Sequence, residues 1–185
     1  MDHMNTQKAL FRNWHTKGFT VVEIVVVIAV IGILAAIVLA SYGSAQARAR
    51  DSTRMHDLNT IKSALKVHAT FKGDWVEAGS GCGYNGDGGG WFNYTNGSTY
   101  TKSISTCLEE AGYLDTPIID PTGGKTSSPT SGYTYMKYHC GSGASLRVFV
   151  YAKLETKPQD TTATDGTCNS SLDSSYGMNY YVQVR

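Results

Sequence analysis

The sequence lacks the motifs of the common hydrolases and metalloenzymes. It contains no G-x-S-x-G nucleophile elbow and no H-E-x-x-H zinc motif, and no cysteine and histidine have a structural reason to meet. It also lacks an excess of charge, because 16 Lys and Arg face 15 Asp and Glu, and a net charge of +1 argues against a nucleic-acid-binding domain. With 41% hydrophobic and 17% charged residues it is no disordered tail either. We expect no enzyme, no cofactor and no specific nucleic-acid partner.

Strongly apolar sequence is scarce outside one segment. Residues 19–40 (FTVVEIVVVIAVIGILAAIVLA) carry a single charge, Glu23. As a helix they would be roughly 33 Å long and could cross a bilayer core of about 30 Å. The preceding residues are basic, so the N-terminus should stay in the cytoplasm and the chain after residue 40 should lie outside (Lys8, Arg12 and Lys17 against Asp2). A secretory signal fits poorly, because its apolar region is shorter, about 7–15 residues, and a small-residue cleavage site follows it.

Glu23 is the unexpected residue of this segment. An isolated carboxylate inside a membrane costs about 3 kcal/mol even on lenient insertion scales, and such groups are functional candidates by default. A plain signal-anchor helix would match the length and the flanking charges but gives no reason for the carboxylate.

Residues 17–23 (KGFTVVE), followed by IVVVIAVIGILAAI, closely resemble the N-terminus of type IV pilins and type II secretion pseudopilins. The resemblance implies that a prepilin peptidase cleaves after Gly18, that the new N-terminal Phe19 is methylated on its amine, and that Glu23 guides assembly. It implies as partners further copies of this chain, other pilins and an inner-membrane assembly platform. Gly32 matches a family glycine at which the helix often loosens in a filament, whereas Ala40 stands where many members have Pro.

The pairing of Phe19 and Glu23 also follows from electrostatics. A free α-amine has a pKa of about 7.7–8.0 and is therefore cationic near neutral pH. In a bundle of apolar helices, the amine of one copy and the carboxylate of its neighbour are each expensive to bury alone. Paired, they satisfy each other and fix the axial register of the two helices.

The helix should continue beyond the membrane as an amphipathic segment, residues 41–72. There is no Pro or Gly from 44 to 71, and the stop is Lys72-Gly73. Apolar and aromatic-like positions recur at helical spacing on one side (Leu58, Ile61, Leu65, His68, Ala69). The basic residues fall mostly elsewhere and are interpreted as a solvated face (Arg48, Arg50, Arg54, Lys62, Lys66).

Residues 73–185 should form an extracytoplasmic head, with an irregular region at 73–132 and a β-sheet at 133–185. A short helix is expected at 106–113, ending at Gly112. Alternation with a period of two predicts strands at 133–140, 146–155 and 179–185, which read as an antiparallel sheet with one buried face packed on the amphipathic helix. The fold class is therefore α+β and pilin-like. Three loop acids fit no calcium-ligand pattern, and we expect no metal site (Asp115, Asp120, Asp165).

Four cysteines all follow residue 40, on the predicted oxidising side (Cys82, Cys107, Cys140, Cys168). Their spacings of 25, 33 and 28 residues fit no zinc pattern. Four cysteines permit three connectivities, and sequence alone does not choose between them. We favour the sequential pairs Cys82–Cys107 and Cys140–Cys168, each worth roughly 3–4 kcal/mol in the chain-entropy model.

The sequence thus favours a structural subunit that acts by self-association. The first hypothesis is a pilin, anchored in the cytoplasmic membrane with its N-terminus inside and then polymerised into a surface filament for adhesion, motility or DNA uptake. The second is a pseudopilin of a type II secretion or competence system. The third, from another class, is a binding domain on an uncleaved anchor.

Overall fold

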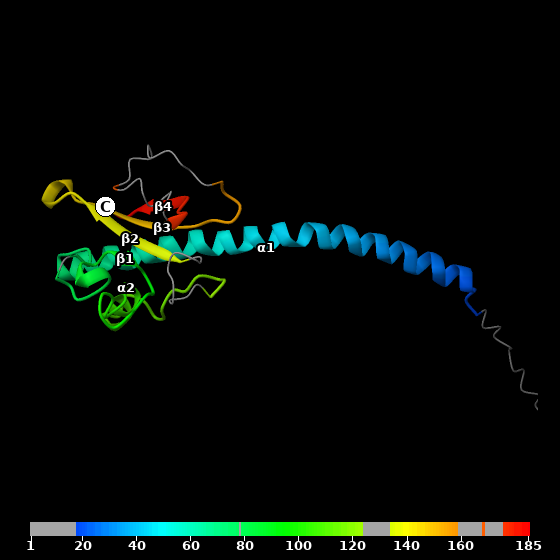
Figure 1. Ribbon diagram of the computed structural model, residues 1–185, viewed down its shortest axis with the longest axis horizontal. Coiled ribbons are helices and arrows are strands. Elements are labelled where there is room, and N and C mark those ends of the chain that lie inside the picture. The colour runs from blue at the N-terminus through cyan, green and yellow to red at the C-terminus, as the bar shows by residue number, and fades with distance from the viewer. Residues whose placement is uncertain (1–17, 78, 124–133, 159–167, 169–175) are drawn as a thin grey trace, which may run out of the picture. The chain divides into compact units, whose positions relative to one another are not determined.

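The computed structural model describes residues 18–77, 79–123, 134–158, 168 and 176–185 (Figure 1). It divides into two compact units, residues 1–42 and residues 43–185, which we call the N-terminal unit and the head. In chain order the elements are α1 (Val21–Lys72), η1 (Tyr84–Gly86), β1 (Gly90–Trp91), α2 (Ile104–Glu110), β2 (Tyr135–Cys140), η2 (Gly143–Ser145), β3 (Arg147–Ala152) and β4 (Tyr180–Gln183).

Helix α1 is a single helix of 52 residues, as the pattern predicted. It ends at Lys72, and Gly73 follows with a φ of +81°, a conformation that glycine adopts without steric cost and that commonly terminates helices. One 18-residue stretch of α1 is long and apolar enough to cross a membrane, and none of that stretch is buried inside the chain. The large apolar side chains of the N-terminal unit therefore have no partner within the described protein.

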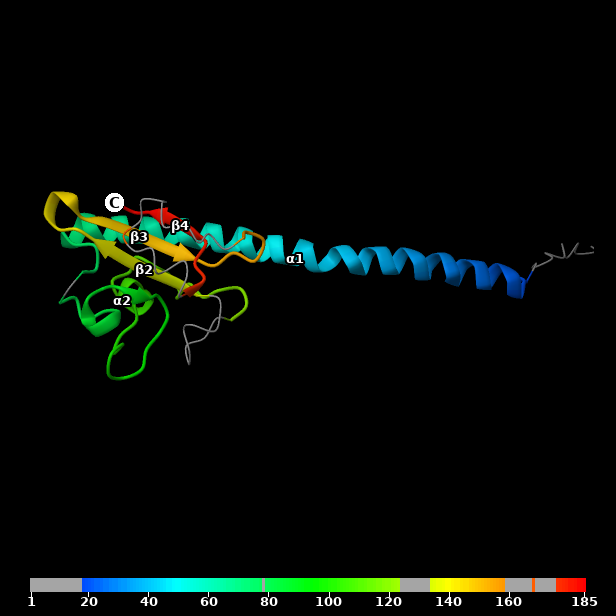
Figure 2. The ribbon, with the colours of Figure 1, turned by 45° about the horizontal axis from the view of Figure 1, so that its top comes forward.

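The head contains a four-stranded antiparallel sheet in the order β1-β2-β3-β4. Figure 2 shows β2 and β3 running in opposite directions alongside the head's part of α1. The three strands expected from alternation are present within the predicted ranges, and Tyr133, where the first was expected to begin, lies outside the described residues. Strand β1 was not predicted, because it has two residues and follows a run of glycines.

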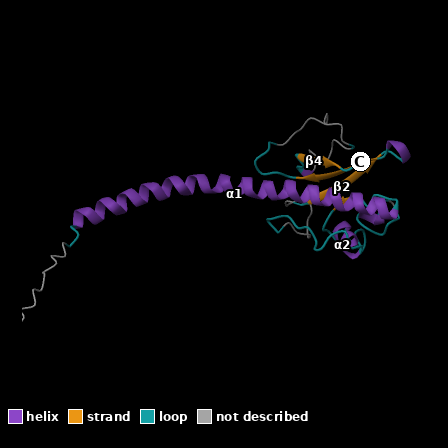
Figure 3. Ribbon diagram, turned by 180° about the vertical axis from the view of Figure 1, so that it is seen from behind, coloured by secondary structure: helices purple, strands orange, loops and turns teal. Residues whose placement is uncertain are grey.

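One face of the sheet packs on α1 and α2 (Figure 3). This core joins Leu58, Ile61 and Leu65 of α1, Ile104 and Leu108 of α2, and side chains of β2 and β3 that include Val148 and Val150. The apolar stripe of α1 thus packs as expected. Helix α2 begins earlier than predicted because Ser103 caps it, its hydroxyl accepting from the N–H of Thr106.

The opposite face of the sheet is buried too, which differs from the single buried face that the alternation predicted. Phe149 and Tyr151 of β3 are 2% and 1% exposed and pack with Trp91, Met136 and Met178 in a second core. Aromatic side chains bury more area than the residues usually found on a solvated face. Both faces of the central strands are therefore covered, as in a three-layered packing.

Two disulfides cross-link the head. Cys82, in the loop after α1, is bonded to Cys107 of α2, and Cys140, at the end of β2, is bonded to Cys168. These are the sequential pairs that we favour from the sequence, and the described residues include no free cysteine. The first bridge ties the glycine-rich loop to the short helix.

Candidate functional site

The N-terminal unit presents one carboxylate at the start of an exposed apolar helix. Glu23 Oε2 accepts hydrogen bonds from the backbone N–H of Thr20 (2.7 Å) and from its hydroxyl (2.8 Å). In return the N–H of Glu23 donates to Thr20 Oγ1 (3.2 Å). This reciprocal arrangement is a capping box, written in the sequence as T-V-V-E. Glu23 therefore contacts only its own helix start, and no described Lys, Arg or His forms an ion pair with it.

The expected processing site lies immediately before this cap. Gly18 and Phe19 precede the helix and are exposed, and the Phe19 side chain is 82% exposed. The segment that a peptidase would remove, residues 1–17, lies outside the described residues. Three sequence-predicted site residues, Gly18, Phe19 and Glu23, thus lie at the start of α1.

The head carries a second charged cluster, which the sequence did not predict. The side chain of Arg54 is 0% exposed. Its guanidinium donates to both carboxylate oxygens of Asp120 (2.6 and 3.1 Å), to Asp51 (2.8 Å) and to Glu155 (2.7 Å). The interpretation of the arginines as a solvated face is wrong for Arg54. A planar fork of five donors can be buried when carboxylates satisfy it, which is what Asp51, Asp120 and Glu155 do here.

The carboxylates of this cluster are held in their ionised form. Hydrogen bonds from Arg50, and then from Arg54, lower the pKa of Glu155 to about 2, against a smaller opposing effect of burial. Burial acts to raise the pKa of Asp51, yet the backbone N–H groups of Glu155 and Thr156 more than offset it and the pKa is lowered. The cluster links α1 to the end of β3 and to the loop at Asp120, so it is a structural tie.

The acids weighed as calcium ligands are engaged elsewhere or stand apart. Asp120 is paired with Arg54, Asp115 is exposed, and Asp165 lies outside the described residues. Within the described part of the chain, no group of three His, Cys, Asp or Glu side chains is arranged to hold a metal ion.

Lys137 of β2 is the second buried cation that sequence reasoning missed. It is 0% exposed, and its ammonium donates to the backbone oxygens of Val76 (2.6 Å) and Gly88 (2.8 Å). Burial lowers its pKa to about 7, which the more distant acids Glu77 and Asp74 counteract only in part. Every residue has a backbone oxygen, so no residue pattern could have predicted which of them the amine of Lys137 contacts.

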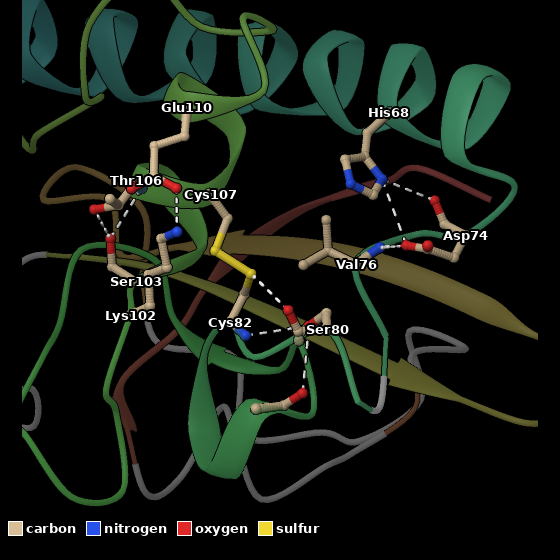
Figure 4. Close-up of a disulfide and its surroundings, with 12 residues drawn as sticks. His68, Asp74, Val76, Ser80, Cys82, Lys102, Ser103, Thr106, Cys107 and Glu110 are labelled. Carbon is tan, nitrogen blue, oxygen red and sulfur yellow. Dashed lines mark hydrogen bonds and ion pairs between the residues drawn. A yellow bond between two sulfur atoms is a disulfide. The ribbon is translucent and has the colours of Figure 1, made fainter.

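An open hollow of about 370 Å³ lies beside the Cys82–Cys107 bridge (Figure 4). His68 projects from α1 onto it and contacts the backbone oxygen of Asp74 (3.0 Å). Lys102 and Glu110 pair with each other on its other side. Of the charged groups around this hollow, His68 lies near Asp74 and Lys102 pairs with Glu110, so four of them have a partner there.

These features define a class of protein. An exposed apolar helix needs other chains or lipid to cover it, and a disulfide-linked α+β head follows it. The chain therefore combines an N-terminal helix that is suited to contact lipid or other chains with a folded head.

Comparison with known proteins shows what the chain is similar to. Residues 15–39 match the prokaryotic N-terminal methylation motif, which includes Phe19 and Glu23. The fimbrial protein EcpC of Eikenella corrodens is 29% identical over 133 residues, 71% of this chain and 86% of that protein. The type IV major pilin PilE of Neisseria gonorrhoeae is 26% identical over 168 residues, 86% of this chain and 97% of that protein. The chain therefore carries the N-terminal methylation motif and is similar to type IV pilins over most of its length.

Other relatives match a smaller part of the chain. The type IV major pilin PilA of Myxococcus xanthus is 30% identical over 82 residues, which cover 44% of this chain and 37% of that protein. No solved structure matches the chain significantly.

Proposed function

We propose that this chain is a pilin precursor that is cleaved after Gly18, methylated at Phe19 and polymerised through α1 into a surface filament. The observation that carries the proposal is the coincidence of two features. The methylation motif covers residues 15–39, and within it lies Glu23, the single carboxylate in the part of α1 whose large apolar side chains are exposed. A filament core of packed helices would cover that apolar surface, and the carboxylate would meet a cation there.

The cation is the α-amine that cleavage creates. Methylation keeps the charge of an amine. With the amine of Phe19 on one copy placed against Glu23 of the next, both charges are neutralised in a low dielectric, and the pair fixes how far one helix slides along the other. The capping box supports this role, because Thr20 occupies Oε2 of Glu23 and holds the carboxylate at the helix start. No described residue donates to the other oxygen, Oε1.

The same segments of the chain imply an order for insertion, cleavage and polymerisation. Residues 1–18 serve as a leader on the cytoplasmic side, residues 19–40 hold the precursor in the cytoplasmic membrane, and residues 41–185 lie outside. A prepilin peptidase removes the leader, and an inner-membrane platform lifts the mature chain into a growing polymer with further copies and other pilins. The relatives' printed names, fimbrial protein and major pilin, support a surface filament over a short secretion pseudopilus.

The direct test is the mass of the N-terminal peptide of the chain isolated from its host. The expected result is a peptide that begins at Phe19 and carries a methyl group. A matched variant, Gly18→Leu, should accumulate as a precursor that retains Met1. Recovery of Met1 from the unaltered chain would overturn the cleavage. Surface fibres built mainly of this chain should be visible by electron microscopy, and a processed chain without fibres would overturn the filament.

A further inference from the structure

The loop between β1 and α2 holds an Asn–Gly pair, Asn96–Gly97. Backbone N–H groups contact the side-chain oxygen of Asn96 and polarise its amide. The side-chain oxygen of Asn96 accepts three hydrogen bonds, from the backbone N–H groups of Ser98 (3.2 Å), Thr99 (2.9 Å) and Tyr100 (2.7 Å). The N–H of Asn96 donates to the oxygen of Tyr100 (2.9 Å), which closes the loop. Three convergent N–H groups form a concavity for an anion, and here they surround an amide oxygen.

The residue after Asn96 is suited to attack the same side chain. Gly97 is exposed, has a φ of +75°, and has no atom within 4 Å of the position that a Cβ would take. No described residue accepts a hydrogen bond from its N–H. Without a Cβ, the backbone nitrogen of a glycine can approach the preceding side chain more closely than that of any other residue.

We propose that Asn96 is a self-modification site, at which the folded loop promotes cyclisation and deamidation of the Asn96–Gly97 pair. When the Gly97 nitrogen attacks Cγ of Asn96, the negative charge develops on Oδ1. That atom is the one that the N–H groups of Ser98, Thr99 and Tyr100 contact. Donors already aimed at the atom that becomes negative stabilise a tetrahedral intermediate, as an oxyanion hole does.

The reaction needs only water. Hydroxide removes the proton from the Gly97 nitrogen, and that nitrogen forms a bond to Cγ of Asn96. The bond between Cγ and Nδ2 then breaks, and Nδ2 takes a proton from water and leaves as ammonia. The resulting five-membered succinimide adds water at either carbonyl carbon and opens to aspartate or to isoaspartate. No electron is transferred to or from the chain.

The structure also distinguishes the two products. An aspartate at position 96 would accept the same three N–H groups with a charged oxygen, and such charge-assisted bonds are the stronger kind. An isoaspartate would insert a methylene into the backbone and disrupt the closure from Asn96 to Tyr100. Aspartate is therefore the product that the folded loop accommodates, and each modified copy gains one negative charge on the surface of its head.

A second Asn–Gly pair, in η1 before β1, is a built-in control. Asn85 precedes Gly86, whose N–H donates to the oxygen of Gly83 (3.3 Å) and is thereby less available for attack. No described residue donates a hydrogen bond to the side-chain oxygen of Asn85. The two pairs thus share their chemistry and differ in the donors around the asparagine oxygen and in the hydrogen bond of the glycine N–H.

The test compares both pairs in the folded chain and in short peptides of the same sequence. The full-length chain in detergent is incubated at mildly alkaline pH in heavy-oxygen water, and peptide mapping follows oxygen incorporation at Asn96 and Asn85. We expect the ratio of the two rates to be at least about tenfold higher in the folded chain than in the peptides. An equal ratio, or slower conversion of Asn96 in the folded chain, would show that the loop protects the amide and would overturn the proposal.

Two variants sharpen the result. Thr99→Pro removes one of the three N–H donors and leaves the Asn96–Gly97 pair and the Thr99 backbone oxygen in place, so conversion of Asn96 should fall toward the peptide rate. Asn96→Asp has no side-chain amide and should therefore release no ammonia at this position, and it should keep the native disulfide pattern and circular dichroism. A Thr99→Pro chain that remains folded and deamidates at the original rate would exclude the role of the N–H donors.

Discussion

Glu23 and Glu155 are the same side chain in opposite settings. Glu155, in the head, receives the guanidinium groups of Arg50 and Arg54, which are 105 and 101 residues earlier in the chain. Glu23, in the N-terminal unit, bonds only with Thr20 in its own first turn. A carboxylate whose charge is neutralised within its own chain is not available to form an ion pair with another chain. The carboxylate that the described residues leave without a cation is the one that can select a neighbouring chain.

The largest expected effect is at the unneutralised carboxylate. Glu23→Ala removes the group that would meet the α-amine of an adjacent copy, and the amine would then be buried without a counter-ion. We expect membrane insertion and cleavage to continue and filaments of the variant to be absent by electron microscopy. Glu155→Ala is the matched control in the head, and it should lower the stability of the chain but still permit filaments. Filaments of normal length and number from Glu23→Ala would refute the role in register.

The next effect tests the opposite side of the comparison. Arg54→Met removes one partner of a buried cluster and leaves Asp51, Asp120 and Glu155 without their shared cation. Breaking a buried pair in this way costs about 3–5 kcal/mol. Denaturant unfolding of the full-length chain in detergent should show this loss. Arg48→Met, at an exposed position of the same helix, should change stability by no more than about 0.5 kcal/mol. A loss at Arg54 as small as that at Arg48 would mean that the cluster is not a structural tie.

The surroundings of each charged residue explain whether its role could be predicted from the sequence. The exposed acid was found because an apolar run makes a lone carboxylate conspicuous, and the end of α1 was found because Lys72-Gly73 is a local signal. Arg54 was misread because a buried and a solvated arginine look alike in a helix. Its partners Asp120 and Glu155 are 66 and 101 residues away, and only the folded chain brings them together.

The third prediction contrasts the two kinds of buried charge in the head by pH. Because the pKa of Glu155 is lowered to about 2, its contribution is present above the unfolded pKa of about 4.3 and is lost as pH falls toward 2. The pKa of Lys137 also makes stability rise with pH, over a higher range, because burial disfavours its charged form. Its pKa is lowered to about 7, so between about pH 7 and 10.4 the unfolded chain binds a proton that the folded chain does not, and stability rises with pH across that range.

Lys137→Met separates this rise from other titrations. Unfolding free energies of the full-length chain and the variant are measured from pH 6 to 10, and their difference should change in favour of the unaltered chain as pH rises. The variant also loses the bonds to Val76 and Gly88, but that loss is the same at every pH. A difference that is constant over the whole range would contradict a neutral amine in the folded head.

The smallest expected effect is at Thr20, which orients Glu23 without carrying charge. Thr20→Val keeps the size and the apolar character of the helix start and removes the hydroxyl that donates to Glu23 and accepts from its N–H. Loss of such a cap costs about 1 kcal/mol, and Thr20→Ser should restore it. We expect Thr20→Val to lower filament yield without abolishing it, since the backbone N–H of Thr20 still bonds to the carboxylate. Filament mass per cell measures the effect. Complete loss, equal to that of Glu23→Ala, would assign Thr20 a direct contact with the neighbouring copy, whereas wild-type yield would show that the cap has no part in assembly.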